Sequence, residues 1–189
     1  IAVNLYTESE LSLPGLKIRQ TTAYPEAETV RLTISADETF TLTLRIPGWC
    51  RDAKISVGTN VFYPASGWFS LPVNAGNTEI ELLFPMPVRL IRGTMAQTGR
   101  AALMRGPLVY AFEMKRNGLS AHETDLLAID NSQAFDVQPD GIRVACVIQN
   151  QTHPRKELLF TRFSNEHRTR TYFPVLSENG LENDGLYKN

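Results

Sequence analysis

Hydrophobic and polar residues alternate along much of this chain, and the alternation predicts β-strands. In the segment 40–46, aromatic and aliphatic residues occupy every even position, while threonine and arginine occupy the odd ones. The same period of two recurs at residues 30–35, 79–84 and 142–148. Successive side chains of a strand point to opposite faces of its sheet, so each segment is expected to bury one face.

Shorter segments with the same character predict further strands. They are residues 1–6, 16–22, 53–57, 68–71, 88–92, 101–104, 108–113, 126–129, 157–163 and 170–175. Turn-forming pairs separate several of them, as at Pro14-Gly15 and Asn117-Gly118. No stretch of a dozen residues has a convincing period of 3.6. The best helix candidate, residues 121–130, could equally be a loop that runs into a strand.

Many short strands joined by tight turns are typical of β-sandwiches. We therefore predict an all-β fold, an antiparallel β-sandwich built as two packed, jelly-roll-like subdomains. A weakly marked boundary at residues 93–99 divides the chain into domain I, residues 1–94, and domain II, residues 95–189. Strands of sandwich proteins can exchange across such a boundary.

The composition argues against several classes of function. The 189 residues are 42% hydrophobic, enough to bury a sizeable core, and the net charge of −1 argues against nucleic acid or an anionic membrane as a partner. The longest apolar stretch, around residues 82–88, is interrupted by Pro85 and Pro87 and is too short to span a bilayer. The chain opens on Ile1 within an alternating pattern, without an initiator methionine or signal peptide. We therefore expect a piece of a longer protein, and its compartment stays undetermined.

Histidines and cysteines are too scattered to predict a metal site. His122, His153 and His167 form no close pair, and we expect them in surface loops. Cys146 lies on the apolar face of a predicted strand, where a cysteine usually serves as a small hydrophobic residue. Cys50 lies at a strand end, and neither thiol has neighbours that mark it as a nucleophile. A disulfide between the two cysteines is conceivable from the sequence.

Paired carboxylates, the usual catalytic groups of a glycosidase, are the next candidates. Glu79 and Glu81 share a strand face, but it is the face opposite the apolar residues, and we interpret both as solvated. The sequence contains no GxSxG elbow, phosphate-binding loop or dinucleotide fingerprint. We therefore predict no catalytic residues, no metal and no cofactor in this chain.

Aromatic residues near strand ends are the remaining candidates for ligand contact. Trp49, Tyr63 and Trp68 lie close to turns in the first half of the chain. Exposed rings of this kind stack on the apolar faces of sugars, so they could form a carbohydrate platform, with Asn60 or Asn74 fixing the orientation. The alternative, which we favour, is that the tryptophans fill a core or an interface.

An ordered series of motifs resembles a known family. The most specific pieces are LRIPGW at residues 44–49, PMPVR at 85–89 and RGPLVY at 105–110. They follow VNLYTESEL at 3–11 and precede a looser match at 158–173. In this order and at these separations, the motifs resemble the C-terminal region of the β-L-arabinofuranosidase-like proteins of glycoside hydrolase families 127 and 146.

The resemblance implies an accessory region rather than a catalytic one. In that family an N-terminal (α/α)₆ barrel carries a cysteine nucleophile, which other cysteines and a glutamate hold on zinc, and paired β-sandwiches pack against the barrel. No residue of this sequence matches that constellation, so Cys50 and Cys146 do not inherit its role, and zinc is expected only in the barrel. The parent enzyme would cleave a terminal arabinofuranosyl bond with retention, whereas this chain alone is expected to be inactive.

The shared motifs also have structural interpretations. Pro47 ends a strand because it lacks an N–H group, and Gly48 is expected to permit the turn. Arg105 is expected to be a partly buried hydrogen-bonding hub beside a bend at Gly106-Pro107. The motifs therefore mark fold or docking.

Three functions stay open on the sequence. We favour the non-catalytic C-terminal β-sandwich portion of such a glycoside hydrolase, which supports the catalytic barrel as its partner. The alternatives are a carbohydrate-binding module, and a scaffold or interaction domain with no role in sugar binding. Without its barrel, the chain would expose a docking face that favours self-association.

Overall fold

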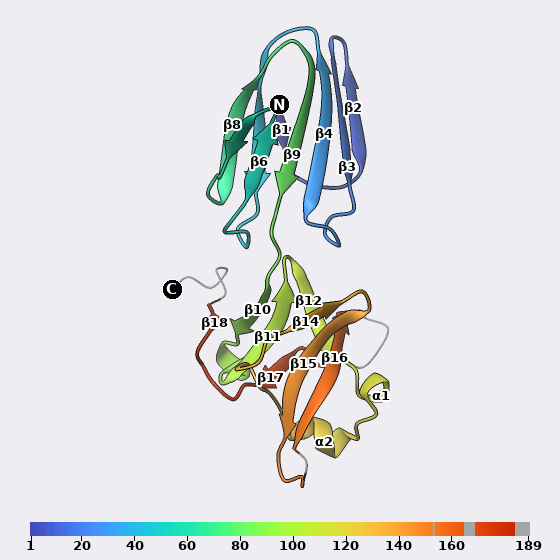
Figure 1. The fold of residues 1–189 in the computed structure, drawn as a ribbon, viewed down its shortest axis with the longest axis vertical. Helices are drawn as coiled ribbons and strands as arrows, with labels where there is room; N and C mark the ends of the chain where they lie inside the picture. Colours follow the sequence, from blue (N-terminus) through green and yellow to red (C-terminus); the bar gives the residue numbers. More distant parts are fainter. Residues whose placement is uncertain (153, 165–168, 184–189) are drawn as a thin grey trace. The chain divides into compact units, whose positions relative to one another are not determined.

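The computed structural model describes residues 1–152, 154–164 and 169–183. The chain divides into two compact units, Ile1–Met86 and Pro87–Asn189. Most of the regular secondary structure in the described ranges is β-strand, as Figure 1 shows. This confirms the all-β class predicted from the alternation.

The division between the units falls between Met86 and Pro87, before the boundary expected after residue 94. Strand β10 (Val88–Arg92) explains the difference, because all five of its residues pair with β11 (Arg100–Arg105) of the second unit. Pro87 lacks an N–H group, so a strand ladder is interrupted at this position. Among the described strands, none pairs across the division.

The first unit is a sandwich of two sheets. Its strands are β1 (Ala2–Val3), β2 (Ser9–Leu13), β3 (Leu16–Thr22), β4 (Thr29–Ala36), β5 (Phe40–Ile46), β6 (Lys54–Val57), β7 (Asn60–Phe62), β8 (Gly67–Val73) and β9 (Gly76–Leu83). One sheet has the order β1-β5-β8, and the other has the order β2-β3-β4-β9-β6-β7. Neighbouring strands are antiparallel, except that β1 runs parallel to β5.

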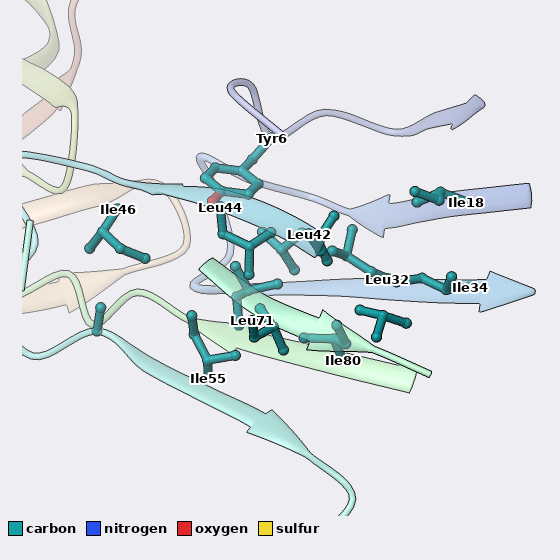
Figure 2. Close-up of a cluster of buried hydrophobic side chains, with 14 of the residues drawn as sticks. Tyr6, Ile18, Leu32, Ile34, Leu42, Leu44, Ile46, Ile55, Leu71 and Ile80 are labelled. Carbon is teal, nitrogen blue, oxygen red and sulfur yellow. The ribbon is translucent and has the colours of Figure 1, made fainter. Parts of the chain in front are cut away.

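The alternating pattern produces the core of the first unit. Along β4, the side chains of residues 30, 32 and 34 are buried, while those of residues 31, 33 and 35 are exposed. Figure 2 shows Leu42 and Leu44 of one sheet in the same hydrophobic cluster as Leu32 and Ile80 of the other. Burying one such side chain contributes roughly 1.5–3 kcal/mol, so this cluster is the main force that holds the sheets together.

The N-terminal part of this unit differs from the sequence-based expectation. Residues 1–6 contain the two-residue strand β1, and Tyr6 turns into the core, where its hydroxyl donates to the Arg45 carbonyl at 2.6 Å. The buried Gln20 side chain holds the next segment by donating to the backbone carbonyls of Leu5 and Thr7. Strand β2 follows, and the side chains of all five of its residues are exposed.

The described strands of the second unit form one connected sheet. Besides β10 and β11 they are β12 (Leu108–Phe112), β13 (Leu127–Ile129), β14 (Asp136–Gln138), β15 (Gly141–Ile148), β16 (Arg155–Arg162), β17 (Tyr172–Pro174) and β18 (Leu181–Glu182). The main order is β13-β15-β16-β12-β11-β10-β18, with β14 on β15 and β17 on β11. A bridge between Ile129 and Val175 joins the end of β17 to β13, so the sheet closes on itself.

Short helices connect the strands of the second unit. They are η1 (Met95–Gln97), α1 (Met114–Asn117) and α2 (Ala121–Asp125). A capping box starts α2: the Ser120 hydroxyl accepts from the Glu123 N–H, and the Glu123 carboxylate accepts from the Ser120 N–H at 2.9 Å. The segment 121–130, for which helix and loop both stayed open, is therefore a short helix followed by β13.

The second unit has a core of its own. Phe112, Phe160 and Phe173 are fully buried, and their ring centroids lie 5.4–5.8 Å apart in tilted and edge-on pairs. The hydrophobic clusters of the two units share no residue. Each unit thus buries its own apolar side chains.

Candidate functional site

Trp68 lies on the solvent face of the three-stranded sheet. Its side chain is 60% exposed, while the alternate residues of β8 face the core. Trp68 pairs with Arg45 of β5, and on the same face the hydroxyls of Thr43 and Ser70 are hydrogen-bonded at 2.8 Å. An indole beside a guanidinium and two hydroxyls can stack on a sugar ring and hydrogen-bond to its hydroxyl groups.

Trp49 and Tyr63 do not extend this surface. Trp49 is half-buried and packs against the core of the first unit. Tyr63 is 75% exposed, but it follows β7, at the edge of the other sheet. The adjacent residues Phe62 and Phe69 contact each other between the sheets, with ring centroids 5.4 Å apart. In the part of the chain that the structure describes, no ring contact unites the three candidates into a platform.

An aromatic cluster that the sequence analysis missed forms at Tyr6, Tyr24 and Phe84. The ring centroids are 5.0–6.3 Å apart. Burial, followed by the charge of Tyr24, raises the pKa of Tyr6 far above its usual range. Burial also raises the pKa of Tyr24, despite a hydrogen bond from the Trp49 indole. Both hydroxyls therefore stay protonated at neutral pH and serve the packing of this cluster.

The RGPLVY motif forms the hairpin between β11 and β12. Arg105 pairs with Leu108 across the two-residue turn Gly106-Pro107, and Gly106 has a φ of 56°, which the first position of a type II′ turn requires. Arg89, which the sequence analysis did not single out, binds this turn from β10. Its side chain is 12% exposed and donates to the Gly106 carbonyl at 3.1 Å and to Glu182 at 3.3 Å. The Arg89 guanidinium thereby joins the PMPVR motif, to which it belongs, to the RGPLVY motif.

Both cysteines are buried, and neither forms a disulfide. Cys50 belongs to the core of the first unit and Cys146 to that of the second, so the conceivable disulfide between them is wrong. Burial, with a contribution from the charge of Asp130, raises the pKa of Cys146 to about 12. A thiol in this state is a poor nucleophile and a poor metal ligand at neutral pH.

The described residues contain no group of three or more histidines, cysteines, aspartates or glutamates that could hold a metal ion. His122 is exposed on α2, whereas His153 and His167 lie outside the described residues. Glu81 forms a 3.0 Å ion pair with Arg31 on the solvent face of the six-stranded sheet, as expected for a solvated carboxylate. No described helix has the length and apolar character needed to cross a membrane.

Comparison with known proteins identifies the first unit. Residues 1–86 match the family model described as "Beta-L-arabinofuranosidase, GH127 middle domain", and this range is the whole of that unit. The first unit matches the family 127 middle domain along its whole length. The resemblance seen in the motifs is confirmed, and the middle domain is a more specific assignment than the C-terminal region inferred from them.

A curated relative of this chain is the non-reducing end β-L-arabinofuranosidase of Bifidobacterium longum subsp. longum. The two are 35% identical over an alignment of 119 residues, and the match covers 54% of this chain and 18% of the relative. The two units together resemble a family 127 β-L-arabinofuranosidase from Geobacillus stearothermophilus T6. That match has a TM-score of 0.68 and 26% identity, and it covers 92% of this chain and 33% of the relative.

A second solved structure, a family 127 β-arabinofuranosidase, supports the same fold. It has a TM-score of 0.71 at 22% identity, and it covers 96% of this chain and 36% of that protein. The chain therefore spans about a third of the length of these solved relatives.

Proposed function

We propose that this chain is the non-catalytic β-sandwich portion of a β-L-arabinofuranosidase-like glycoside hydrolase, and that it supports a catalytic (α/α)₆ barrel. The observation that carries the proposal is the family 127 middle-domain match over the whole first unit. Solved relatives that align with more than nine-tenths of this chain are about three times as long, which leaves room for a separate catalytic domain in them.

The chemistry of the buried groups supports the same role. A cysteine nucleophile needs an ionised or metal-bound thiol, and burial keeps the Cys146 thiol neutral. The phenol groups of Tyr6 and Tyr24 are also held protonated, at hydrogen-bonding positions within the fold. We therefore place the nucleophile and the zinc of the parent enzyme in its barrel.

An activity assay of the purified chain tests the proposal. We expect no release of nitrophenol from p-nitrophenyl β-L-arabinofuranoside and no stoichiometric zinc by elemental analysis. Turnover that survives purification and disappears in Cys50→Ser, but not in Cys146→Ser, would overturn a non-catalytic assignment.

The supporting role needs a second experiment, on the Geobacillus enzyme itself. Removing the region that aligns with this chain should lower the melting temperature and the soluble yield of the remaining part, because its docking surface becomes exposed. An unchanged melting temperature, together with unchanged activity, would contradict the supporting role.

A second candidate function is carbohydrate contact at Trp68, which the exposure of its ring on the face of β8 favours. Arabinan oligosaccharides should quench or shift its fluorescence, and Trp68→Ala should abolish the heat of binding in calorimetry. Tyr63→Ala is the control, because Tyr63 is also exposed but follows a strand of the other sheet. The absence of both heat and a fluorescence change would exclude this contact.

A further inference from the structure

A hollow lies on the second unit, outside the residues that carry the proposed function. Its volume is about 270 Å³, and it is lined by residues from the end of β13, from β15 and from β16. Asp130 follows β13 directly and is held to β15 by a hydrogen bond from its N–H to the Ala145 carbonyl at 2.8 Å. Gln133, Arg155 and Glu157 also line the hollow.

Asp130 is unusual because a carboxylate is seldom buried without a full set of partners. Its side chain is 4% exposed, and its Oδ1 atom accepts from the Ser132 N–H at 3.3 Å and from the Ser132 hydroxyl at 2.6 Å. The Oδ2 atom faces a guanidinium nitrogen of Arg155 at 3.9 Å, beyond hydrogen-bonding distance. Among the described residues, Oδ2 thus has no donor at hydrogen-bonding distance.

The charges around the hollow select the class of ligand. The carboxylates of Asp130 and Glu157 are offset by Arg155, whereas Lys156, which also lines the hollow, forms a 3.6 Å ion pair with Glu123. A phosphate would be repelled by the two carboxylates, and a divalent cation would be repelled by the Arg155 guanidinium. A neutral molecule rich in hydroxyl groups avoids both penalties, because each hydroxyl can donate to a carboxylate and accept from a guanidinium.

We propose that this hollow binds a neutral saccharide through two vicinal hydroxyl groups. One hydroxyl donates to Asp130 Oδ2, and its neighbour accepts from Arg155, whose side chain is 77% exposed and free to close over the sugar. No aromatic residue is among those that line the hollow, so recognition rests on hydrogen bonds, and affinity is on the order of millimolar. The site lies beyond the residues matched to family 127 and does not depend on the supporting role.

Titration of the ¹⁵N-labelled full chain with L-arabinose, followed by amide chemical shifts, tests the proposal. We expect saturable shifts confined to residues 130–133, 145 and 155–157. Asp130→Asn and Arg155→Gln should each raise Kd about tenfold, the loss typical of one charge-assisted hydrogen bond. Because Asp130 is buried, Arg155→Gln is the variant that tests the site without a risk to the fold.

Asp140→Asn is the matched control. Asp140 faces Arg143 at 3.8 Å, nearly the separation of Asp130 and Arg155, but it does not line the hollow, so Kd should stay unchanged. The proposal is overturned if L-arabinose causes no saturable shift, or if Arg155→Gln binds as tightly as the unmodified chain. It is also overturned if calcium chloride or sodium phosphate, rather than the sugar, shifts these amides.

Discussion

Burial and hydrogen bonding in the folded chain set the chemistry of three residues in this protein. Burial raises the pKa of Tyr6 and Cys146, because the ionised forms would lose their hydration. At Glu123 the hydrogen bond from the Ser120 backbone, followed by one from Gln151, stabilises the carboxylate and lowers its pKa to about 2. The same types of residue elsewhere in the chain need not behave this way.

Thiol reactivity tests the environment of Cys146. With a pKa of about 12, roughly one thiol in ten thousand is ionised at pH 8, so native Cys146 should not react with Ellman's reagent. Cys50 is buried too, and both thiols should react fully in guanidinium chloride. Because folding raises the Cys146 pKa from 9, its contribution to stability is present below pH 9 and is lost as the pH rises toward 12. Rapid labelling of a full equivalent of native Cys146 would contradict this.

Acid unfolding tests Glu123. Its pKa is lowered from 4.5 to about 2 in the folded chain, so the carboxylate stabilises the fold above pH 4.5, and this stabilisation disappears as the pH falls to 2. Glu123→Gln should therefore reduce the free energy of unfolding at pH 7, and the difference from the unmodified chain should shrink towards pH 2. Urea titrations at several pH values measure it. Glu79→Gln, on a solvent face, is the control and should stay within about 0.5 kcal/mol at each pH.

At the scale of single elements, two glycines differ in whether their backbone conformation and their neighbours leave room for a side chain. Gly141 starts β15 with a φ of 154°, and a Cβ atom there would lie 2.3 Å from the Phe160 carbonyl oxygen. Gly48 in the RIPGW motif has no such φ, and a Cβ atom would meet nothing within 4 Å. Gly48 lies in a turn, as expected, but neither its φ nor crowding requires a glycine there.

Alanine substitutions at these two glycines make the contrast measurable. Gly141→Ala should lower the free energy of unfolding by about 2–4 kcal/mol, because strain and steric overlap add. Gly48→Ala should change it by less than about 0.5 kcal/mol. Equal losses in the two variants, measured by urea unfolding, would refute this reading of the turns.

The strand pattern predicted elements well where one face is buried and poorly elsewhere. Residues 16–22, 40–46 and 88–92 form strands with the predicted bounds. Strands β2 and β14, which the sequence analysis missed, have all of their side chains exposed. Their partners determine them: β2 pairs with β3 over five residues, and β14 pairs with β15 over three.

At the scale of the whole molecule, the separate cores predict separate unfolding. Phe160→Ala should cost the second unit about 3–5 kcal/mol, and Leu42→Ala should cost the first about 2–5 kcal/mol. Both tryptophans of the chain, Trp49 and Trp68, lie in the first unit, so fluorescence reports on that unit alone. Phe160→Ala should shift the calorimetric transition of the second unit and leave the fluorescence midpoint unchanged. A single transition that shifts as one in both variants would show that the units unfold together.

The sequence by itself determined the all-β class, most of the inward-facing positions and the family resemblance, because alternation and turn residues act within a few neighbouring residues. It could not place the division at Pro87 or find the cluster of Tyr6, Tyr24 and Phe84. It also could not distinguish the half-buried Trp49 from the exposed Trp68. These depend on which strands pair and which side chains meet across the sheets, at sequence separations where no local pattern exists. The buried Asp130 carboxylate likewise became visible only when β13, β15 and β16 were placed side by side.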